Sequence, residues 1–529
     1  MKFSDRERFL DWTVYQIYPR SFCDTNGDGV GDLNGVIEKL DHLTELGVSA
    51  IWLCPCYQSP NRDNGYDVSD YREIMDEFGT LDDWKHLREA TRARGIRLIM
   101  DLVANHTSAE HAWFQEARSA RDNPYHEYYI WSKKPPNRWK SLVGGSAWEY
   151  NPQTDEYYLH SFAVEQPDLN WENPKVREEM RAVVEFWTNL GVDGFRCDML
   201  DFISKDFKKD KMLNGPQLQE YIEELFKGIN VFTVGECQSD EKNILSVSKS
   251  LTTVFQFEHI QLGRKNKYTP RAFSYDEVKK VLVKWQEFSQ KHGLLYTLFT
   301  DNHDQPFYLS RMGNDQDLRY ECATMYGATF YLLRGIPFLY QGQEFGFANP
   351  YYPTIEYFED IETLNYYRAN ESKKPLEKLM NEINYGSRDN TRRPMAWTAN
   401  EKDGYGFSTG KPWLAYHSRA KELNAETDRT SEKSVFDFYR KLLAYRNKSK
   451  IIRRGSFRDL TKTKDCFVYE RAFEQKRVLV VCNFERQKKI PLPEGVNEKT
   501  FAFVLGNYKD FQPFSDNFRP FEIAVYEEQ

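Results

Sequence analysis

The chain has 529 residues, a hydrophobic content of 40% and a formal net charge of −8. This length predicts about two to four domains with a sizeable packed core. Because the charge is negative and no basic stripe occurs, we expect no nucleic-acid partner. We also expect no membrane partner, since the N-terminus has no apolar signal-peptide core and no run reaches transmembrane length.

The eight cysteines contain no CxxC pair and no framework typical of a small disulfide-linked domain. We therefore expect reduced thiols in a cytoplasmic protein. Cys54 and Cys56 form a CxC pair, but the surrounding apolar run AIWLCPC favours core packing over metal binding. The aromatic content of 15% suits stacking on flat ligand faces such as sugar rings, and it equally suits core building.

The first predicted strand, residues 13–22, runs into an acidic loop with the pattern D-x-N-x-D-G-x-x-D. Its side-chain oxygens are those of Asp24, Asn26, Asp28 and Asp32. Oxygens at alternate positions with a glycine turn can wrap a hard cation, as in the first positions of an EF-hand. Gly35 stands where an EF-hand has its bidentate Glu, so the loop is not an EF-hand. We expect calcium here, with an acidic turn that binds no metal as the alternative.

Strands and helices then alternate along most of the chain. The predicted strands after the first are residues 48–53, 96–102, 194–198, 231–236, 253–257, 294–300 and 336–340, and the longer helices are residues 35–46, 82–94, 175–190, 216–227, 275–291 and 318–333. Eight βα units predict an α/β fold that closes into a (β/α)8 TIM barrel.

Two stretches interrupt the alternation, and a third replaces it. The segment after strand three, rich in Tyr, Trp, Asn and Pro, is too long for a plain loop and predicts an inserted small domain. A second excursion, about 342–433, shows little regular pattern before a final helix at 434–447. From residue 451 short alternating strands predict an antiparallel β domain. The expected domains are residues 1–104 (barrel), 105–174 (inserted domain), 175–449 (barrel) and 450–529 (C-terminal β-sandwich).

Charged residues gather at the C-terminal ends of the predicted strands, where barrels of this kind place their active sites. Arg196 and Asp198 share one face of strand four, because an i, i+2 pair points to the same side. Glu236 ends strand five, and Asp304 follows strand seven. An ionised carboxylate facing a protonated one is the arrangement that cleaves glycosidic bonds. The alternative for any one of them is a structural ion pair.

Several of these motifs, DLVANH, GFRCD, GEC, DNHD and QPDLN, resemble the conserved regions of the α-amylase superfamily, glycoside hydrolase family 13. QPDLN, RDNTRRPMAW and YQGQEFG are most similar to its oligo-1,6-glucosidase and α-glucosidase branch. The resemblance spans nearly the whole chain. It implies a retaining glycosidase that forms a β-glucosyl intermediate on Asp198.

The resemblance also implies a role for each matching residue. Glu236 is the general acid and then the general base, Asp304 stabilises the distorted sugar, and Arg196 holds and ionises Asp198. His106 and His303 bind sugar hydroxyls, and Tyr66 stacks on the sugar ring. Asp67 and Arg392 grip the non-reducing end of the substrate, which makes the enzyme exo-acting. The neighbouring Arg393 competes with Arg392 for that grip. The acidic loop resembles the branch's calcium site, with Val30 adding its carbonyl. Asp101 is assigned to support of the barrel.

Four positions depart from the branch pattern. Met199 follows the nucleophile, where α-1,6-preferring relatives usually carry Val and α-1,4-preferring ones Ala or Thr. Phe307 replaces an expected Arg, which removes a charge near the substrate entrance. Cys197 and Cys237 neighbour the two reacting carboxylates; we expect them to point into packing, with thiol sensitivity as the alternative.

The main hypothesis is therefore a hydrolase that releases glucose from short α-glucosides with α-1,6 or α-1,4 linkages, sucrose included. A second hypothesis keeps the same residues but transfers or isomerises the glucosyl unit of sucrose- or trehalose-type disaccharides. A third, remote hypothesis is a non-catalytic partner subunit. The sequence leaves open the preferred linkage, a phosphorylated substrate and the choice between monomer and homo-oligomer.

Overall fold

The computed structural model describes residues 6–237 and 240–529, so part of the N-terminal segment analysed for a signal peptide lies outside the described residues. The chain divides into two compact units. The first unit comprises residues 51–255, and the second comprises residues 2–50 and 256–529.

Five parallel strands form the sheet of the first unit, in the spatial order β11–β10–β9–β5–β2. These strands are β2 (Ala50–Leu53), β5 (Arg97–Val103), β9 (Gly194–Asp198), β10 (Phe232–Gly235) and β11 (Thr253–Val254). β9 is buried along its whole length, as expected for a strand covered on both faces. Its register pairs Arg196 with Asp101 on β5, and Asp198 with Val103. This register brings two charged residues of different strands side by side.

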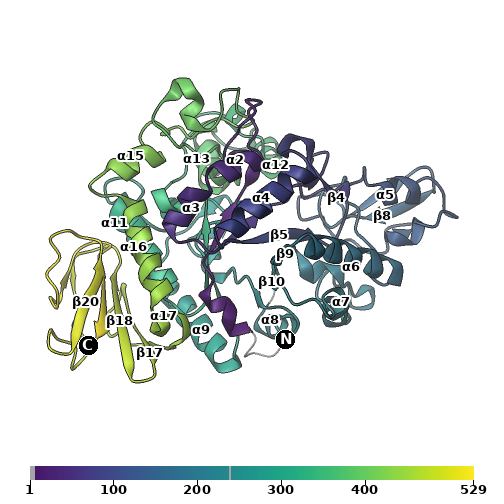
Figure 1. Ribbon diagram of the computed structural model, residues 1–529. Coiled ribbons are helices and arrows are strands. Elements are labelled where there is room, and N and C mark those ends of the chain that lie inside the picture. Colours follow the sequence, from purple (N-terminus) through teal and green to yellow (C-terminus); the bar gives the residue numbers. More distant parts are fainter. Residues whose placement is uncertain (1–5, 238–239) are drawn as a thin grey trace. The chain divides into compact units, whose positions relative to one another are not determined.

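Figure 1 labels the helices of the first unit, and several of them begin at capping signals that the sequence carries. They are α4 (Leu81–Ala93), α5 (Ala112–Ala117), α6 (Pro174–Asn189), α7 (Leu218–Leu225) and α8 (Glu241–Val247). Thr80 and Asp83 form a capping box at α4, and Asn173 caps α6 with Pro174 in its first turn. The predicted helices 82–94, 175–190 and 216–227 are confirmed to within two residues at each end.

The segment between β5 and α6 carries its own small antiparallel sheet, in the order β6–β8–β7. Its strands are β6 (Trp131–Ser132), β7 (Trp148–Asn151) and β8 (Glu156–Leu159). Trp139, Trp148 and Leu159 form a buried cluster under it. The exact boundaries of the inserted domain stay a prediction.

The second unit contributes three further parallel strands, in the order β1–β15–β14. They are β1 (Val14–Ile17), β14 (Thr297–Leu298) and β15 (Ile336–Tyr340). With eight parallel strands in all, the predicted (β/α)8 barrel class is confirmed. The first strand is shorter than predicted, because residues Pro19–Ser21 form a 3₁₀ helix and proline cannot donate to a strand ladder.

Two predictions for the helices of the second unit were wrong. The predicted helix 35–46 is two helices, α2 (Leu33–Glu38) and α3 (Leu40–Leu46), which meet at Lys39 with φ −97° and ψ 5°. The excursion 342–433 contains helices α12 (Ile361–Asn370), α13 (Leu376–Gly386), α14 (Asp389–Arg392) and α15 (Ala425–Thr430). α13 is held by burial of Leu379, Met380 and Ile383 against residues earlier in the excursion, a contact that local periodicity does not reveal.

The other long helices of the second unit agree with prediction. They are α9 (Tyr275–His292), α11 (Arg319–Tyr331) and α16 (Val435–Lys448). The C-terminal strands, yellow in Figure 1, form a five-stranded antiparallel sheet in the order β16–β17–β18–β22–β20. They are β16 (Ser456–Asp459), β17 (Cys466–Phe473), β18 (Lys476–Asn483), β20 (Phe501–Gly506) and β22 (Ile523–Glu528). Strands β19 (Lys488–Lys489) and β21 (Asn517–Phe518) pair separately, so the predicted antiparallel C-terminal domain is confirmed.

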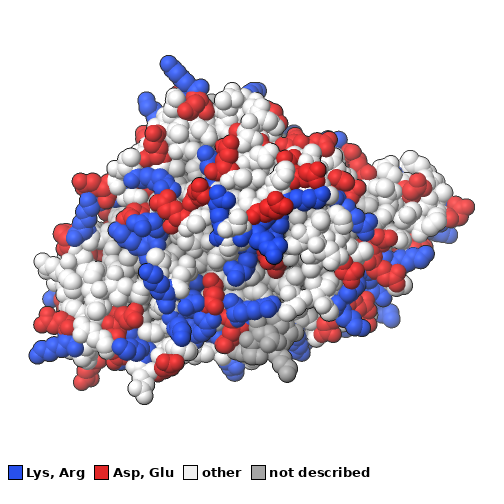
Figure 2. All heavy atoms as spheres, in the orientation of Figure 1, with Lys and Arg blue, Asp and Glu red and all other residues white. Residues whose placement is uncertain are grey.

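On the face shown in Figure 2, Lys and Arg side chains are interspersed with Asp and Glu side chains. Within the part of the chain that the structure describes, no helix is both long and apolar enough to cross a membrane.

Candidate active site

The guanidinium of Arg196 binds three carboxylates in the first unit. Its Nη1 lies 2.7 Å from Asp101 Oδ1 and 2.5 Å from Asp198 Oδ1. Its Nη2 lies 2.5 Å from Glu236 Oε2. Asp101 and Asp198 come from neighbouring strands β5 and β9, while Glu236 directly follows β10. The parallel strands therefore place the two predicted reacting carboxylates, Asp198 and Glu236, beside the two terminal nitrogens of the Arg196 guanidinium.

The side chains of Arg196 and Asp101 are at most 2% exposed, so water does little to screen the charges of this cluster. One positive charge cannot neutralise three negative ones in a low-dielectric site, so the cluster favours taking up a proton. Burial raises the pKa of Asp198; Arg196 lowers it, but Glu236 and Asp101 raise it again, and the pKa ends well above its usual value. Arg196 thus lowers the pKa of Asp198, as predicted, but burial and the two neighbouring carboxylates outweigh this effect.

Aromatic rings complete the surroundings of Arg196. The indole nitrogen of Trp52 donates to the other oxygen of Asp101 at 2.7 Å. The Arg196 guanidinium lies 5.1 Å from the ring centroid of Trp52 and 5.7 Å from that of Tyr66. Asp101 thus supports the cluster through two partners, in line with the supporting role expected for it.

Tyr66 and Asp67 lie between β3 (Tyr57–Gln58) and β4 (Asp70–Ile74). Asp67 is fully buried and accepts hydrogen bonds from the Ser59 hydroxyl and from the backbone amides of Arg62 and Asp63. Burial raises the pKa of Asp67 to about 6. Both of its oxygens are engaged within the loop, so the loop shape depends on this carboxylate.

His106 lies beside Tyr66 and is 1% exposed. Its Nε2 lies 3.1 Å from the carbonyl oxygen of Tyr66, and its Nδ1 lies 3.2 Å from the Asn105 amide nitrogen. Burial lowers the pKa of His106, which keeps the ring neutral. The Asn105 amide nitrogen donates to Nδ1, and the Gln166 amide nitrogen lies 3.1 Å from Nε2.

Asp304 in the second unit has the opposite environment from Asp198. Its oxygens lie 2.6 Å from Arg392 Nη2, 3.3 Å from Arg388 Nη1 and 2.9 Å from His303 Nε2. Burial raises the pKa of Asp304, but His303, Arg392 and Arg388 lower it by more than burial raises it. The pKa of Asp304 therefore ends well below its usual value. Asp304 therefore stays ionised.

Gln16 on β1 orients His303. The amide nitrogen of Gln16 lies 2.8 Å from His303 Nδ1. Since that nitrogen donates, Nε2 of His303 carries the proton and donates to Asp304. Gln16 and Arg388 were not among the predicted site residues, although Gln16 lies in the predicted strand 13–22 and Arg388 begins the motif RDNTRRPMAW.

The structure separates Arg392 from Arg393. Arg392 binds Asp304 and the His303 carbonyl, and its Nη1 has no hydrogen-bond partner among the residues described. Arg393 donates to the carbonyls of Ala415 and Tyr357 and lies over the Tyr352 ring at 4.3 Å. Arg392 therefore belongs to the Asp304 cluster, and Arg393 belongs to the packing of the excursion.

The acidic loop forms a series of turns closed by its own side chains. Asp24 accepts the amides of Gly27 and Gly29, and Asn26 and Asp28 each accept the amide two residues on. Asp32 instead caps α2 by accepting Gly35 N, and its oxygens also accept from Thr25. Across residues 6–237 and 240–529, no three His, Cys, Asp or Glu side chains are grouped so as to hold a metal. The oxygens of Asp24, Asn26 and Asp28 and the Val30 carbonyl fit a calcium loop better than Asp32 does.

The departing positions also have clear surroundings. Met199 has φ +38° and ψ 45°, a left-handed conformation that is uncommon for a residue with a side chain, and it is 6% exposed. Phe307 is 4% exposed and precedes α10 (Tyr308–Met312), so it is a packing residue.

Three comparisons with known proteins bear on this arrangement. Residues 16–455 match the family model of the α-amylase catalytic domain. The chain is 43% identical to the oligo-1,6-glucosidase of Parageobacillus thermoglucosidasius, over 99% of each chain. Among solved structures it resembles Bacillus licheniformis trehalose-6-phosphate hydrolase, with a TM-score of 0.93 and 37% identity over 98% of this chain and 99% of that one. It also resembles a trehalulose synthase, with a TM-score of 0.92 and 35% identity over 98% and 99% of the two chains.

Cys197 and Cys237 are buried next to the charge cluster. Cys197 is fully buried and Cys237 is 2% exposed. Burial raises the pKa of both thiols well above the usual value. Thiols are poor nucleophiles when protonated and inaccessible.

We expect iodoacetamide to leave Cys197 and Cys237 unmodified in the folded protein, because neither thiolate forms nor reaches solvent. Mass spectrometry of peptides from native and urea-unfolded protein measures the alkylated fraction. Alkylation of either residue in the native protein at the rate found after unfolding would contradict this.

Proposed function

The chain belongs to the α-amylase family and is a glycoside hydrolase, and we propose that it releases single glucose units from the non-reducing ends of short α-glucosides. The observation that carries this proposal is the Arg196 guanidinium, which holds Asp198 and Glu236 on adjacent nitrogens. Two carboxylates kept this close suit a retaining double displacement, in which they stand about 5–5.5 Å apart.

In the proposed mechanism Asp198 attacks the anomeric carbon while Glu236 protonates the leaving oxygen. Breaking the glycosidic bond leaves a β-glucosyl ester on Asp198. Glu236, now ionised, removes a proton from water, and the water attacks the ester to release glucose with retained configuration. One cation beside three carboxylates favours holding one proton within the cluster. We assign that proton to Glu236 and the ionised state to Asp198 from the resemblance of the motifs.

The remaining roles are assigned from the resemblance of the motifs. We assign the ionised Asp304 to the sugar hydroxyls, with His303 and His106 as further hydroxyl partners and Tyr66 as the stacking ring. Arg392 has a free Nη1 that supports its assignment to the non-reducing end. Asp67 is assigned to the same end, either by direct contact or by shaping its loop through Ser59 and the amides it accepts. Such a grip makes the enzyme exo-acting.

For the linkage we propose α-1,6 bonds as in isomaltose. The relative from Parageobacillus thermoglucosidasius is named an oligo-1,6-glucosidase, and this supports the choice. Met199, with its long side chain and left-handed backbone beside Asp198, is proposed to narrow the space beyond the cleaved bond.

A second candidate keeps the same residues but uses a different acceptor or substrate. It is favoured by the likeness to a trehalulose synthase and to a trehalose-6-phosphate hydrolase. In the first case the enzyme transfers or isomerises the glucosyl unit, and in the second it hydrolyses a phosphorylated disaccharide.

We further propose that the acidic loop binds one structural calcium ion through Asp24, Asn26, Asp28 and the Val30 carbonyl. The side-chain oxygens of Asp24, Asn26 and Asp28 stand at alternate positions of the loop and accept its amides, which supports this proposal. We also propose a cytoplasmic location, since the sequence has no CxxC pair and no framework typical of a small disulfide-linked domain.

Replacing Asp198 by Asn removes the nucleophile, so we expect glucose release to fall by several orders of magnitude. Purified protein is assayed on isomaltose, maltose, sucrose, trehalose and trehalose 6-phosphate, with products identified over time. Isomaltose should be the best substrate, and disaccharide products with little free glucose would favour the second candidate instead. Undiminished release by the variant would refute the assignment.

Removing the charge of Asp101 should move the acidic limb of the activity profile. Asp198 must be ionised, so activity is lost as the pH falls through its pKa, and the charge of Asp101 raises that pKa. Asp101→Asn should therefore shift the acidic limb to lower pH by about one unit. The measurement is kcat against pH, with Asp193→Asn, which lies just before β9 and outside the cluster, as the matched control. A shift to higher pH, or an equal shift in the control, contradicts the charge argument.

Removing calcium should destabilise the protein, because an ion bound only by the folded state stabilises it. We expect a chelator to lower Tm and excess calcium to restore it. Asp28→Ala should lose this response without loss of the fold, since Asp28 is exposed and accepts only one amide. Equal Tm values with and without chelator would rule out the calcium site.

A further inference from the structure

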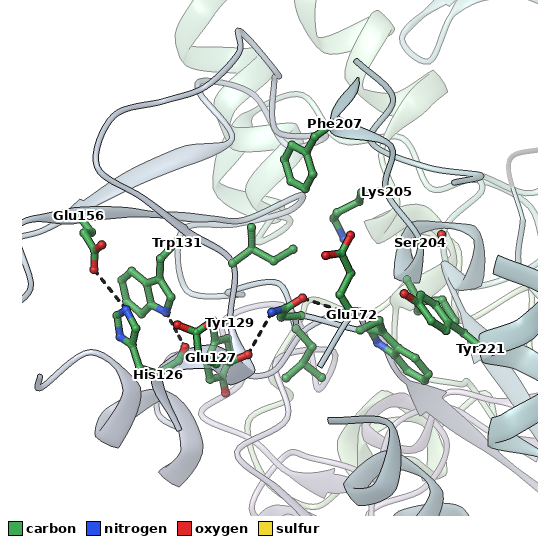
Figure 3. Close-up of a pocket in the computed structure, with 15 residues that line it drawn as sticks. His126, Glu127, Tyr129, Trp131, Glu156, Glu172, Ser204, Lys205, Phe207 and Tyr221 are labelled. Atoms are coloured by element: carbon green, nitrogen blue, oxygen red, sulfur yellow. Dashed lines mark hydrogen bonds and ion pairs between the residues drawn. The ribbon is translucent and has the colours of Figure 1, made fainter. Parts of the chain in front are cut away.

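A cavity of about 260 Å³ lies in the first unit, apart from the Arg196 cluster. Its wall is built by the inserted segment, by the residues that follow β9 and by Tyr221 of α7 (Figure 3). Neither Asp101, Arg196, Asp198 nor Glu236 lines it. The cavity is therefore a separate feature that the proposed mechanism does not use.

Aromatic side chains form much of the wall: Tyr129, Trp131, Trp171, Phe207 and Tyr221. Phe207 is 41% exposed, which is unusual for so large an apolar side chain, and its ring stacks on Trp139 with centroids 5.0 Å apart. In Figure 3, Phe207 lies at the top of the group of lining residues and Tyr221 lies at its right. Aromatic rings held in this way offer apolar surface to a flat ligand.

Hydrogen-bonding groups without partners accompany these rings. Ser204 is 2% exposed, and its hydroxyl has no partner among the residues described. A buried hydroxyl left unpaired is costly, which points to a ligand or water that completes it. The carboxylate of Glu172 is exposed, and in Figure 3 it points toward the side on which Phe207 lies. The cavity thus offers apolar surface together with a hydroxyl and a carboxylate.

Charge narrows the class of ligand. The cation in the wall, Lys205, is already engaged, with its Nζ 2.9 Å from Asp168 and 3.0 Å from Asn105. Glu127, Glu156 and Glu172 make the lining acidic, which disfavours a phosphate or a carboxylate ligand. Glu156 is already paired with Arg121 and His126, whereas Glu127 and Glu172 are exposed and offer acceptor oxygens to a ligand. A neutral sugar ring can stack on the aromatic side chains, and its hydroxyl groups can donate hydrogen bonds to the carboxylate oxygens.

We propose that this cavity is a second carbohydrate-binding site, which takes a single glucopyranose unit. The volume supports one ring, because it lies below the ~300 Å³ at which sites for drug-sized ligands begin. The choice of glucose rests on the proposed function, since a glucosidase works where glucose and its oligomers are abundant. The positions of Phe207, Ser204 and Glu172 in the wall support a ligand that has both an apolar face and hydroxyl groups.

The test is a titration of the full chain with D-glucose, followed by saturation-transfer NMR and by crystals soaked in glucose. Two bound glucose molecules are expected, one of them beside Phe207. Phe207→Ala should weaken that site about fivefold to tenfold, which corresponds to a lost aromatic contact. Glu172→Gln, a change at an exposed side chain, should also weaken it and guards against a folding effect of the first variant.

Phe503→Ala is the matched control, because Phe503 is similarly exposed at 37% and stacks on Phe511 in the C-terminal sheet. It should leave both sites intact. D-glucitol, which has the hydroxyl groups but no ring, should not bind beside Phe207. Equal binding of glucitol, or glucose binding that neither cavity variant changes, overturns the proposal. If the proposed function fails instead, glucose still binds beside Phe207 while hydrolysis of every α-glucoside is absent.

Discussion

One buried guanidinium shared by three carboxylates is the constraint on which the candidate active site depends. Arg196 cannot neutralise Asp101, Asp198 and Glu236 together, and burial prevents water from doing so. The cluster therefore favours holding a proton, and a proton held between a nucleophile and an acid is what a retaining glycosidase needs at the start of its cycle. The same constraint makes the site sensitive to Asp101, a residue that needs no contact with substrate to influence the reaction.

In the second unit, the cations around Asp304 outnumber the carboxylates. There one carboxylate is surrounded by two guanidinium groups and a histidine, so it remains ionised. Gln16 fixes the histidine tautomer from a different strand, which directs the Nε2 proton toward Asp304. Opposite pKa shifts on two aspartates thus follow from the number of cations beside each, and they support different roles for Asp198 and Asp304.

Much of the fold was predictable because it depends on local patterns. Strands 194–198 and 336–340 were predicted to the residue, since a glycine marks where each begins: Gly194 opens the first and Gly335 precedes the second. The helices of the excursion were missed, because α13 is stabilised by a cluster that includes Tyr352 and Phe358 rather than by its own pattern. Gln16 and Arg388 were missed for a related reason: their partners lie 287 and 84 positions away, and no spacing rule links them.

The sequence by itself determined the order of strands and helices, the antiparallel C-terminal domain and the family motifs that carry Asp198, Glu236 and Asp304. These depend on periodicity, turn residues and short motifs, all of which are local. Only the tertiary structure decided that Arg392 rather than Arg393 binds Asp304, and that burial and two neighbouring carboxylates outweigh Arg196 in setting the pKa of Asp198. Those outcomes depend on distances and on the exclusion of water, which arise when strands far apart in the chain are brought together.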